Sequence, residues 1–263
     1  MSNMLIFGMG YAASRLAERL LARGWDVGGT TRDGRTGTIP FENKGLVLER
    51  LRSATHILSS VPPDGTFDPV LASYGDAIAV APATWVGYLS SAGVYGDTGG
   101  AWVDEGAPVK GRRADRNAAD AAWCTLRGTF YNFRLPGIYG PGRSMLDRIR
   151  AGTAHRIDLP GQVFSRIHVD DIADGVIASF AGPPGTYNLA DDEPVHRNRL
   201  IEWGCALLGA PLPPLQSLDD AGLSPAARAF YSENRRVANG KAKRLLGWTP
   251  RYPSYREGLV TCV

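Results

Sequence analysis

The feature that most restricts the fold is a glycine-rich turn that follows a short apolar run near the start of the chain. Met4–Phe7 is apolar, and Gly8–Ala13 then reads G-x-G-x-x-A. Apolar or small residues recur at helical spacing through Tyr11–Arg23, with charged residues on the opposite face. A second short strand ending at Thr31 completes a strand–helix–strand unit of about thirty residues. The chain is therefore predicted to begin with a parallel βαβ unit.

The chemistry of this turn suits the phosphates of a dinucleotide. Gly8 permits the tight turn, and Gly10 has no Cβ that would block a pyrophosphate. The free N–H groups at the start of the helix, at Tyr11 and Ala12, face such an anion, and the helix dipole adds to the attraction. The alternative is a glycine turn that binds no ligand.

Strands and helices continue to alternate after this unit. The expected elements are strands at His56–Val61, Trp85–Ser90 and Tyr131–Leu135 and helices at Pro69–Ala79 and Arg112–Arg127. This alternation predicts an α/β fold with a doubly wound parallel sheet and helices on both of its faces. The connection from Thr31 to His56 contains Arg32–Thr38, which is rich in glycine, threonine and charge, so a shortened or irregular crossover is expected there.

The pattern loosens after Gly140, which predicts a small second lobe. Two further helices, a sharp break and a proline-rich linker are expected at Asp170–Phe180, Arg197–Leu208, Gly182–Gly185 and Ala210–Pro214. We assign residues 1–140 and 161–181 to the dinucleotide-binding core. Residues 141–160 and 182–263 are assigned to a small C-terminal lobe that covers the substrate.

Composition limits the function classes. The 263 residues include 29 basic and 26 acidic side chains without a basic stripe, which disfavours a dedicated nucleic-acid binder. The cysteines Cys124, Cys205 and Cys262 are scattered, and the four histidines form no ligand pattern, so neither a disulfide framework nor a metal site is expected. No apolar run approaches ~18 residues and no signal peptide is recognisable, so we expect a cytoplasmic protein without a membrane segment.

The end of the second strand bears on which dinucleotide is bound. An acidic residue there binds the ribose 2′-hydroxyl of NAD, whereas arginine suits a 2′-phosphate. Arg32 follows Thr31 directly, so NADP(H) is preferred, with the hydroxyl of Thr30 or Thr31 as a further donor to the phosphate. Asp33 leaves NAD(H) open. The alternative for Arg32 is a solvated loop charge.

Five segments carry a family resemblance. Leu89–Asp97 resembles the S-S-x-x-V-Y-G segment of the extended short-chain dehydrogenase/reductase superfamily, in its NAD-dependent epimerase/dehydratase group. The other four follow in the family's order, at Arg134–Gly142, Arg166–Ala173, Tyr187–Pro194 and Lys243–Pro250. The resemblance implies a Rossmann core that binds a nicotinamide dinucleotide and a smaller C-terminal lobe over a small-molecule substrate of the sugar or nucleotide-sugar type.

The resemblance also implies site residues. In this family a Ser, a Tyr and a Lys perform the chemistry, because the Tyr exchanges a proton with the substrate while hydride moves to or from the nicotinamide. Ser91 stands at the Ser position, where its alternative role is to cap the strand end. The predicted cofactor contacts are completed by strand-end residues, namely Ser60, Val61, Pro136 and Ile138.

The sequence departs from the family at the Tyr and Lys positions. With Asp120 aligned to the acidic residue after the Y-x-x-x-K motif, Arg112 stands in the Tyr place and Arg116 in the Lys place. Arg116 could still hold a ribose or phosphate, but a guanidinium stays charged and cannot shuttle a proton. Tyr95 is the leading replacement and Tyr139 the second, each with the alternative of a buried ring whose hydroxyl is already bonded.

Two functions follow. The first is an oxidoreductase or epimerase with a non-standard active site, and the second is a non-catalytic NADP(H) sensor of the atypical branch. Arg143, Arg166 and His168 are candidates for substrate binding, although His168 and Asp170 could simply build the start of a helix, with Asp170 as its N-cap. The resemblance suggests a homodimer through helices such as Arg112–Arg127, and the two arginines at its start leave this open.

Overall fold

A parallel sheet forms the centre of the computed structural model, which describes residues 2–35, 37–65 and 67–263. Within these ranges the sheet has seven strands in the order β11-β7-β5-β4-β1-β2-β3, and all neighbouring strands are parallel. The strands are β1 (Asn3–Phe7), β2 (Asp26–Thr31), β3 (Ile39–Pro40), β4 (His56–Ser59), β5 (Trp85–Ser91), β7 (Tyr131–Leu135) and β11 (Gly185–Asn188). The predicted doubly wound Rossmann fold is confirmed.

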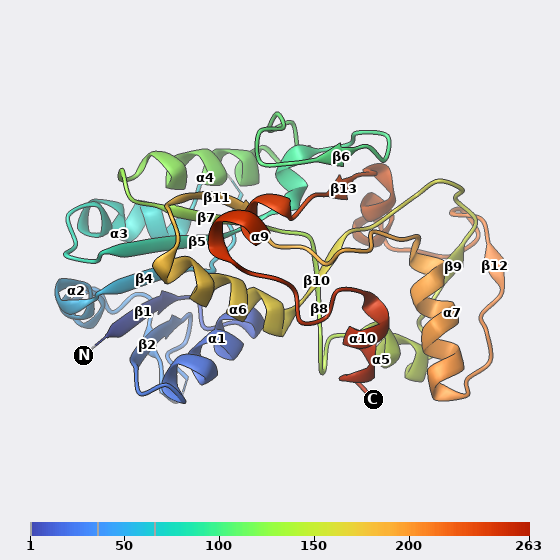
Figure 1. Cartoon of the computed structure of the whole chain (residues 1–263), viewed down its shortest axis with the longest axis horizontal. Coiled ribbons are helices and arrows are strands. Elements are labelled where there is room, and N and C mark those ends of the chain that lie inside the picture. Colours follow the sequence, from blue (N-terminus) through green and yellow to red (C-terminus); the bar gives the residue numbers. More distant parts are fainter. Residues whose placement is uncertain (1, 36, 66) are drawn as a thin grey trace.

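Helices cover both faces of the sheet (Figure 1). One face carries α1 (Tyr11–Leu21) and α6 (Val169–Ala178), which is extended by the 3₁₀ turn η2 (Ser179–Ala181). The other face carries α2 (Lys44–Ser53), α3 (Pro69–Ala79) and α4 (Ala114–Thr125). Side chains of a strand alternate between faces, so Met4 and Ile6 pack under α1 while Leu5 and Phe7 pack under α3. Burial on both faces explains why Met4–Phe7 of β1 is a continuous apolar run.

The lobe lies at one end of the sheet, on the right in Figure 1. Its helices are α5 (Met145–Arg150), α7 (Arg197–Leu208) and α10 (Tyr255–Val260), which share a small core that includes Leu146 and Ile201. Three short parallel pairs lie outside the main sheet: β8 (Gly137–Tyr139) with β10 (Arg166–His168), β9 (Arg156–Ile157) with β12 (Leu215–Gln216), and β6 (Trp102–Val103) with β13 (Arg236–Val237). The last of these pairs joins a segment of the core to a segment of the C-terminal part of the chain. The remaining helical segments are η1 (Ala92–Tyr95), α8 (Pro225–Arg228), η3 (Ala229–Ser232) and α9 (Gly240–Leu246).

The crossover between β2 and β4 differs from the prediction. Arg32–Thr38 has no helix or strand among its described residues, and Thr36 lies outside them. A regular helix, α2, then follows, because the Asn43 side chain accepts a hydrogen bond from the Leu46 N–H at 3.2 Å and caps it. Only Val47 and Leu51 of α2 are buried, so its apolar pattern is too sparse to stand out in the sequence.

The sheet also takes in a segment that the sequence analysis assigned to the lobe. Gly185, with φ +147°, begins β11, which pairs with β7 along the edge of the sheet. Tyr187 on β11 lies in the same core cluster as Ala242 of α9 and Trp248. The chain after residue 182 therefore returns to the core twice, first at β11 and then at α9 and Trp248. No helix in the described part of the chain is long and apolar enough to cross a membrane.

Candidate functional site

The glycine turn lies at the point where the strand order of the sheet reverses. β1 leads to β2 and β3 on one side and neighbours β4 on the other, and ligands of such sheets bind at the carboxyl ends of the diverging strands. Gly8 has φ +83°, a conformation that favours glycine. Gly10 is the N-cap of α1 and provides no side-chain cap, and a Cβ at this position would meet no atom within 4 Å. The first N–H groups of α1 therefore face open space.

A cavity of about 950 Å³ extends from this turn to the lobe. Its volume is at the upper end of the usual range for ligand sites, ~300–1,000 Å³. Most of the residues predicted for cofactor, catalysis or substrate line it, namely Gly10, Tyr11, Ala12, Ser60, Ser91, Arg116, Pro136, Ile138, Arg143 and Arg166. The others lie outside its lining, namely Gly8, Thr31, Arg32, Val61, Tyr95 and His168.

Ser60 and Val61 support the turn in different ways. The Ser60 hydroxyl donates to the Gly8 carbonyl, and its N–H donates to the Phe7 carbonyl at 2.9 Å. The Val61 Cγ2 would lie 2.8 Å from a Cβ placed on Gly8, so Val61 packs against the back of the turn. Ser60 also reaches the cavity, whereas Val61 acts on the turn from behind.

The corner after β2 is built by arginine and threonine. Arg32 is exposed, and the Arg35 guanidinium donates to the Met9 carbonyl in the glycine turn, a contact that the sequence analysis missed. The Thr31 hydroxyl lies 2.7 Å from that of Thr38 and accepts from the Arg35 N–H at 3.2 Å. Backbone N–H groups of its own turn and the Thr31 hydroxyl hold the pKa of Asp33 below its usual range. Asp33 is exposed, and Arg32 and Arg35 supply the positive charge of this corner.

Ser91 caps the end of β5 and also faces the cavity. Its Oγ accepts a hydrogen bond from the Gly93 N–H at 3.1 Å, which makes it the N-cap of η1. This bond uses the oxygen as an acceptor and leaves the O–H proton to be donated elsewhere. The alternative role of Ser91 as a cap is therefore present, and the same residue also lines the cavity.

A buried ion pair holds the strand ends behind Ser91. Arg134 on β7 donates from Nη2 to Asp120 Oδ1 at 2.7 Å and from Nε to Oδ2 at 3.2 Å. Asp120 also accepts from the Ser90 hydroxyl at 2.7 Å and from Asn132 Nδ2 at 2.8 Å. The carboxylate of Asp120, 2% exposed, is thus fully bonded and ties α4 to β5 and β7.

The catalytic role predicted for Tyr95 does not fit its placement. The ring is 2% exposed, and its hydroxyl donates to Asn188 Oδ1 at 2.7 Å and accepts from Arg134 Nη1 at 3.2 Å. Burial raises the pKa of Tyr95 above its ordinary value. The second candidate, Tyr139, lines the cavity, but its hydroxyl donates to the Ser254 carbonyl at 3.4 Å and burial raises its pKa strongly. Both hydroxyls are used inside the protein.

Arginines occupy the two positions where the family has Tyr and Lys, and both arginines line the cavity. α4 begins at Ala114, so Arg112 lies in the loop before it, and its Nε is 3.5 Å from Glu233 Oε1. Glu233 Oε2 accepts from Arg235 Nη1 at 2.8 Å, and the same nitrogen donates to the Gly96 carbonyl at 2.8 Å. Arg116 is half-buried and lines the cavity. The sequence analysis missed Glu233 and Arg235, which bring a loop from the lobe over the Ser91 turn.

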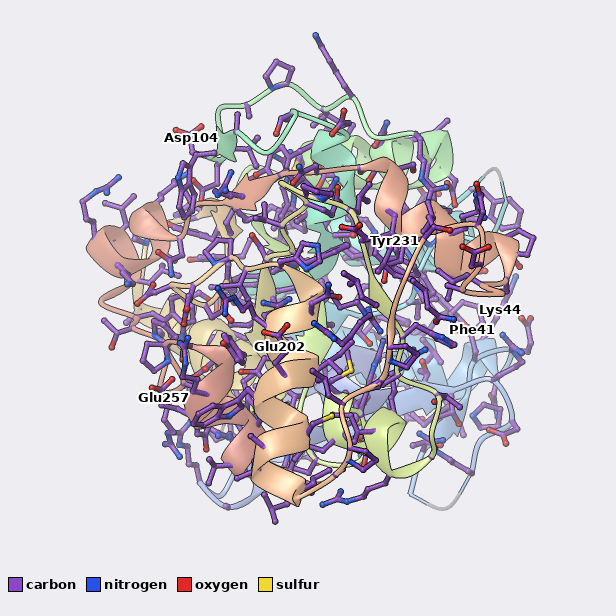
Figure 2. All side chains as sticks on the ribbon, turned by 90° about the vertical axis from the view of Figure 1, so that its right-hand side faces the viewer. Phe41, Lys44, Asp104, Glu202, Tyr231 and Glu257 are labelled. Atoms are coloured by element: carbon purple, nitrogen blue, oxygen red, sulfur yellow. The ribbon has the colours of Figure 1, made fainter. Side chains whose placement is uncertain are left out.

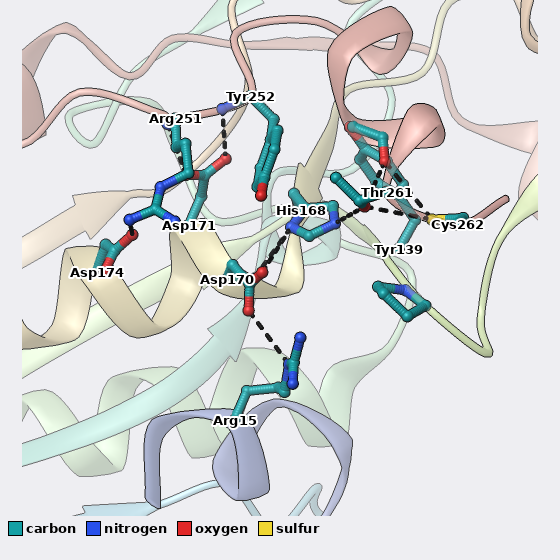
Figure 3. Close-up of polar contacts among 12 residues, drawn as sticks. Arg15, Tyr139, His168, Asp170, Asp171, Asp174, Arg251, Tyr252, Thr261 and Cys262 are labelled. Carbon is teal, nitrogen blue, oxygen red and sulfur yellow. Dashed lines mark hydrogen bonds and ion pairs between the residues drawn. The ribbon is translucent and has the colours of Figure 1, made fainter. Parts of the chain in front are cut away.

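His168 is part of the framework between core and lobe (Figure 3). It is fully buried, and its Nδ1 accepts from the Asp170 N–H at 3.2 Å, so His168 and not Asp170 is the N-cap of α6. The opposite nitrogen, Nε2, lies 3.0 Å from Thr261 Oγ1 and is therefore the protonated one. Burial lowers the pKa of His168 to about 4. Asp170 instead pairs with Arg15 at 3.2 Å. The substrate-binding role predicted for His168 does not fit this placement.

Arginine dominates the charged lining of the cavity. Eight arginines line it: Arg112, Arg113, Arg116, Arg143, Arg148, Arg166, Arg197 and Arg235. The carboxylates in the lining are Asp147 and Glu233. Arginines therefore outnumber carboxylates strongly in the cavity lining, whereas basic and acidic side chains are nearly balanced over the whole chain, whose net charge is +3. Arg143 lies over the Tyr11 ring, with its guanidinium carbon 5.7 Å from the centroid, and so belongs to the glycine-turn end. No group of three or more His, Cys, Asp and Glu in the described chain could hold a metal.

Solved structures share this architecture over nearly the whole chain. A conserved protein of unknown function from Silicibacter pomeroyi is 44% identical, with a TM-score of 0.91 over 99% of this chain and 97% of that one. MoeE5 in complex with UDP-glucuronic acid and NAD is 21% identical, with a TM-score of 0.77 over 99% and 97% of the two chains. The human epimerase family protein SDR39U1 with NADPH is 18% identical, with a TM-score of 0.77 over 98% and 97%.

A curated protein matches part of the chain. The 3-diazoavenalumate denitrifying reductase of a Streptomyces species is 31% identical over 138 residues. The matched segment spans 48% of this chain and 44% of that reductase, so it covers less than half of either protein. No family model matches the chain.

Proposed function

We propose that this chain is a member of the extended short-chain dehydrogenase/reductase superfamily and that it is an NAD(P)-dependent oxidoreductase or epimerase acting on a sugar- or nucleotide-sugar-like substrate. The observation that carries the proposal is the single cavity that joins the glycine turn, the Ser91 loop and the lobe. A dinucleotide at the turn and a substrate under the lobe would meet at Ser91. The complexes of MoeE5 and SDR39U1 with NAD and NADPH support the choice of cofactor.

The residues at the turn fit a nicotinamide dinucleotide. The N–H groups of Tyr11 and Ala12 would hold its pyrophosphate, because a Cβ at Gly10 is absent where the phosphate must approach. Arg143 over the Tyr11 ring adds positive charge beside it. When bound, the dinucleotide supplies a hydride donor or acceptor.

The chain's own residues would orient the reacting oxygen and stabilise charge on it. The Ser91 hydroxyl has a proton to donate, since its oxygen already accepts from the Gly93 N–H. Arg116 contributes a permanent cation beside the reacting centre, which favours a developing negative charge but cannot supply a proton. We therefore propose Ser91 as the hydrogen-bond donor to the substrate oxygen, and Arg116 as the residue that holds the ribose or a phosphate.

Cofactor binding is the first test. Titration of the chain with NADPH and with NADH, followed by tryptophan fluorescence or calorimetry, should show binding of both, with NADPH the tighter. If neither nucleotide binds at millimolar concentration, the proposed function is wrong.

The preference for NADP(H) rests on Arg32. Arg32→Ala should weaken NADPH binding about tenfold, because it removes a charge-assisted bond to the 2′-phosphate, and should leave NADH within about twofold. Arg52→Ala, which removes an exposed arginine from α2, is the matched control and should change neither affinity. Equal losses for the two nucleotides would show that Arg32 does not contact the 2′-phosphate.

A non-catalytic NADP(H) sensor is the second candidate. It is favoured by Arg112 at the Tyr position and by the internal bonding of the Tyr95 hydroxyl. Screening sugars, nucleotide sugars and carbonyl compounds for a change in NADPH absorbance separates the two functions. Turnover that falls strongly in Ser91→Ala but not in Ser53→Ala, an exposed serine of α2, supports the enzyme. Nucleotide binding without turnover of any compound supports the sensor.

Two further proposals concern assembly and compartment. We propose a homodimer through α4, whose Ala118, Ala121 and Ala122 are small and exposed. Sedimentation equilibrium measures this, and a monomer at micromolar concentration would contradict it.

A cytoplasmic location is supported by the three cysteines, all of them free.

A further inference from the structure

Three arginines from different elements meet at the lobe end of the cavity. Arg148 lies on α5, Arg166 on β10 and Arg197 at the first position of α7, and all three line the cavity. We call them the lobe arginine cluster. Their charges act on one another, because Arg197 lowers the pKa of Arg166 and Arg148 lowers that of Arg197, in both cases after the larger effect of burial. The fold thus holds like charges together, at an electrostatic cost.

The three guanidinium groups of the cluster form no ion pair with a carboxylate of the described chain. Among the residues that the structure describes, no carboxylate oxygen lies within 4.0 Å of a nitrogen of any of its guanidinium groups. The nearby carboxylates have other partners, since Asp147 pairs with Arg150 at 3.6 Å and Glu202 pairs with Arg156 at 3.1 Å. The cluster is therefore a set of cations without matched anions.

Arg166 is the member of the cluster whose unpaired charge is most unfavourable, because it is 6% exposed and its Nη1 has no hydrogen-bond partner. The acid that acts on it most strongly is Asp191, whose two carboxylate oxygens are likewise buried without partners. Burial raises the pKa of Asp191 to about 8, while the charge of Arg166 acts in the opposite direction, and no hydrogen bond joins the two side chains. A buried cation without a bonded partner destabilises the folded protein, and a bound anion would offset this cost.

We propose that Arg148, Arg166 and Arg197 form an oxyanion-binding subsite that holds a carboxylate or phosphate group of the substrate. A guanidinium presents paired N–H groups that match the two oxygens of either anion. The subsite is separate from the dinucleotide phosphates, which the glycine turn and Arg143 would bind at the other end of the cavity. It rests on the proposed function only in placing the reacting end of the substrate at Ser91.

Aromatic side chains line the approach to the subsite. Tyr231 of η3 lies close enough to Arg197 and Arg148 for both charges to act on its hydroxyl, and its ring meets Phe164 edge-on, with centroids 5.6 Å apart. Phe230 is 67% exposed and also lines the cavity. Figure 2 shows Tyr231 on the lobe end of the molecule. The subsite is thus suited to an anion attached to an apolar or ring-shaped body.

The test uses small anions as probes on the full chain. Thermal unfolding is measured with inorganic phosphate and with benzoate, each with and without NADPH, against chloride at equal ionic strength and the neutral isostere benzamide. At millimolar concentration, phosphate or benzoate should raise Tm by several degrees beyond chloride and benzamide. A larger shift with phosphate assigns the subsite to phosphate esters, and a larger shift with benzoate assigns it to carboxylates. Shifts no larger than those of chloride and benzamide would overturn the proposal.

Variants locate the effect. Arg197→Gln and Arg148→Gln should each weaken the apparent affinity for the better anion about tenfold or more. Arg199→Gln makes the same change on α7 at an exposed arginine that pairs with Glu202 at 3.7 Å, and should stay within about twofold of the wild type. Arg166→Gln should abolish the anion shift, and if it does not fold, the two other variants decide. Unchanged affinity in both Arg197→Gln and Arg148→Gln would overturn the proposal.

The two proposals fail separately. Anion shifts that occur without NADPH and that Arg197→Gln removes support the subsite, even if neither NADPH nor NADH binds. Nucleotide binding with no anion shift leaves the proposed function standing and overturns the subsite.

Discussion

The two ends of the cavity are built on opposite principles. At the sheet end, polar groups have partners inside the protein: Asp120 accepts four hydrogen bonds, and the Tyr95 hydroxyl both donates and accepts. At the lobe end, Arg166 and Arg197 are held together without a bonded anion in the part of the chain that the structure describes. The sheet end is therefore complete before a ligand arrives, while the lobe end is electrostatically incomplete.

The largest effect is expected from breaking the network at the sheet end. Asp120→Ala removes the partner of the buried Arg134 and should lower the free energy of unfolding by about 3–5 kcal/mol, because an uncompensated buried charge remains. Asp115→Ala on the same helix breaks an ion pair with the half-exposed Arg113 and should cost less than about 1 kcal/mol. Urea denaturation measures both, and equal losses would show that the Asp120 network is not what stabilises this end.

Ligand binding at the same end should be separable from folding. Gly10→Val should weaken NADPH binding at least about a hundredfold, because its side chain enters the space left for the pyrophosphate. The free energy of unfolding should fall by no more than about 1 kcal/mol, since valine is a poorer N-cap than glycine but the position has an ordinary φ of −90° and a Cβ there meets no atom within 4 Å. Gly128→Ala, also in open space but outside the cavity, is the control. A Gly10→Val protein that unfolds, or that still binds NADPH normally, would contradict this account of the turn.

The junction between the two ends should be sensitive to acid. The pKa of His168 is about 4 in the folded chain against 6.5 ordinarily, so its contribution to stability is present above pH 6.5 and is lost as the pH falls through 4. His56, with its pKa also lowered to about 4 by burial, acts in the same direction. Asp171 acts in the opposite direction, because burial raises its pKa from 3.8 to about 6.

His168→Asn isolates the histidine, since asparagine is also a good N-cap. Between pH 6.5 and 4, its free energy of unfolding should fall less steeply than that of the wild type. Chemical denaturation across this range measures both slopes. Equal slopes would mean that His168 is not held neutral by burial.

The smallest effect is expected at the lobe end. Arg197→Gln should leave the free energy of unfolding unchanged or raise it by up to about 1 kcal/mol, because it relieves repulsion from Arg148 and Arg166. Arg199→Gln, which loses an exposed ion pair with Glu202, should change it by less than about 1 kcal/mol. A loss of several kcal/mol in Arg197→Gln would show that this end is stabilised from within, like the sheet end.

Features confined to short stretches of chain were predictable. The glycine turn, the apolar runs of the strands and the helices Pro69–Ala79 and Arg197–Leu208 agree with the structure at or near their ends. Their signals lie in neighbouring residues, because helical spacing, strand runs and tight turns are local properties of the backbone. Helix α2 was missed for the same reason, since its two buried residues, Val47 and Leu51, form too short an apolar pattern.

The roles of single polar residues depended on partners far along the chain. Tyr95 reads as an available acid beside Ser91, yet Asn188 from β11 and Arg134 from β7 bond its hydroxyl. His168 was predicted to bind the substrate, yet its Nε2 is hydrogen-bonded to the hydroxyl of Thr261, far along the chain. Burial and hydrogen bonding set whether such a group can reach a ligand, and neither is visible from local sequence.

The sequence by itself determined the α/β fold and the glycine turn, because both are encoded in contiguous residues or in their order. Only the tertiary structure decided that Arg148, Arg166 and Arg197 share one end of a cavity, and that Glu233 and Arg235 reach the Ser91 turn from the lobe. The physical reason is that charges act through space, so their number follows from the sequence while their balance follows from the fold.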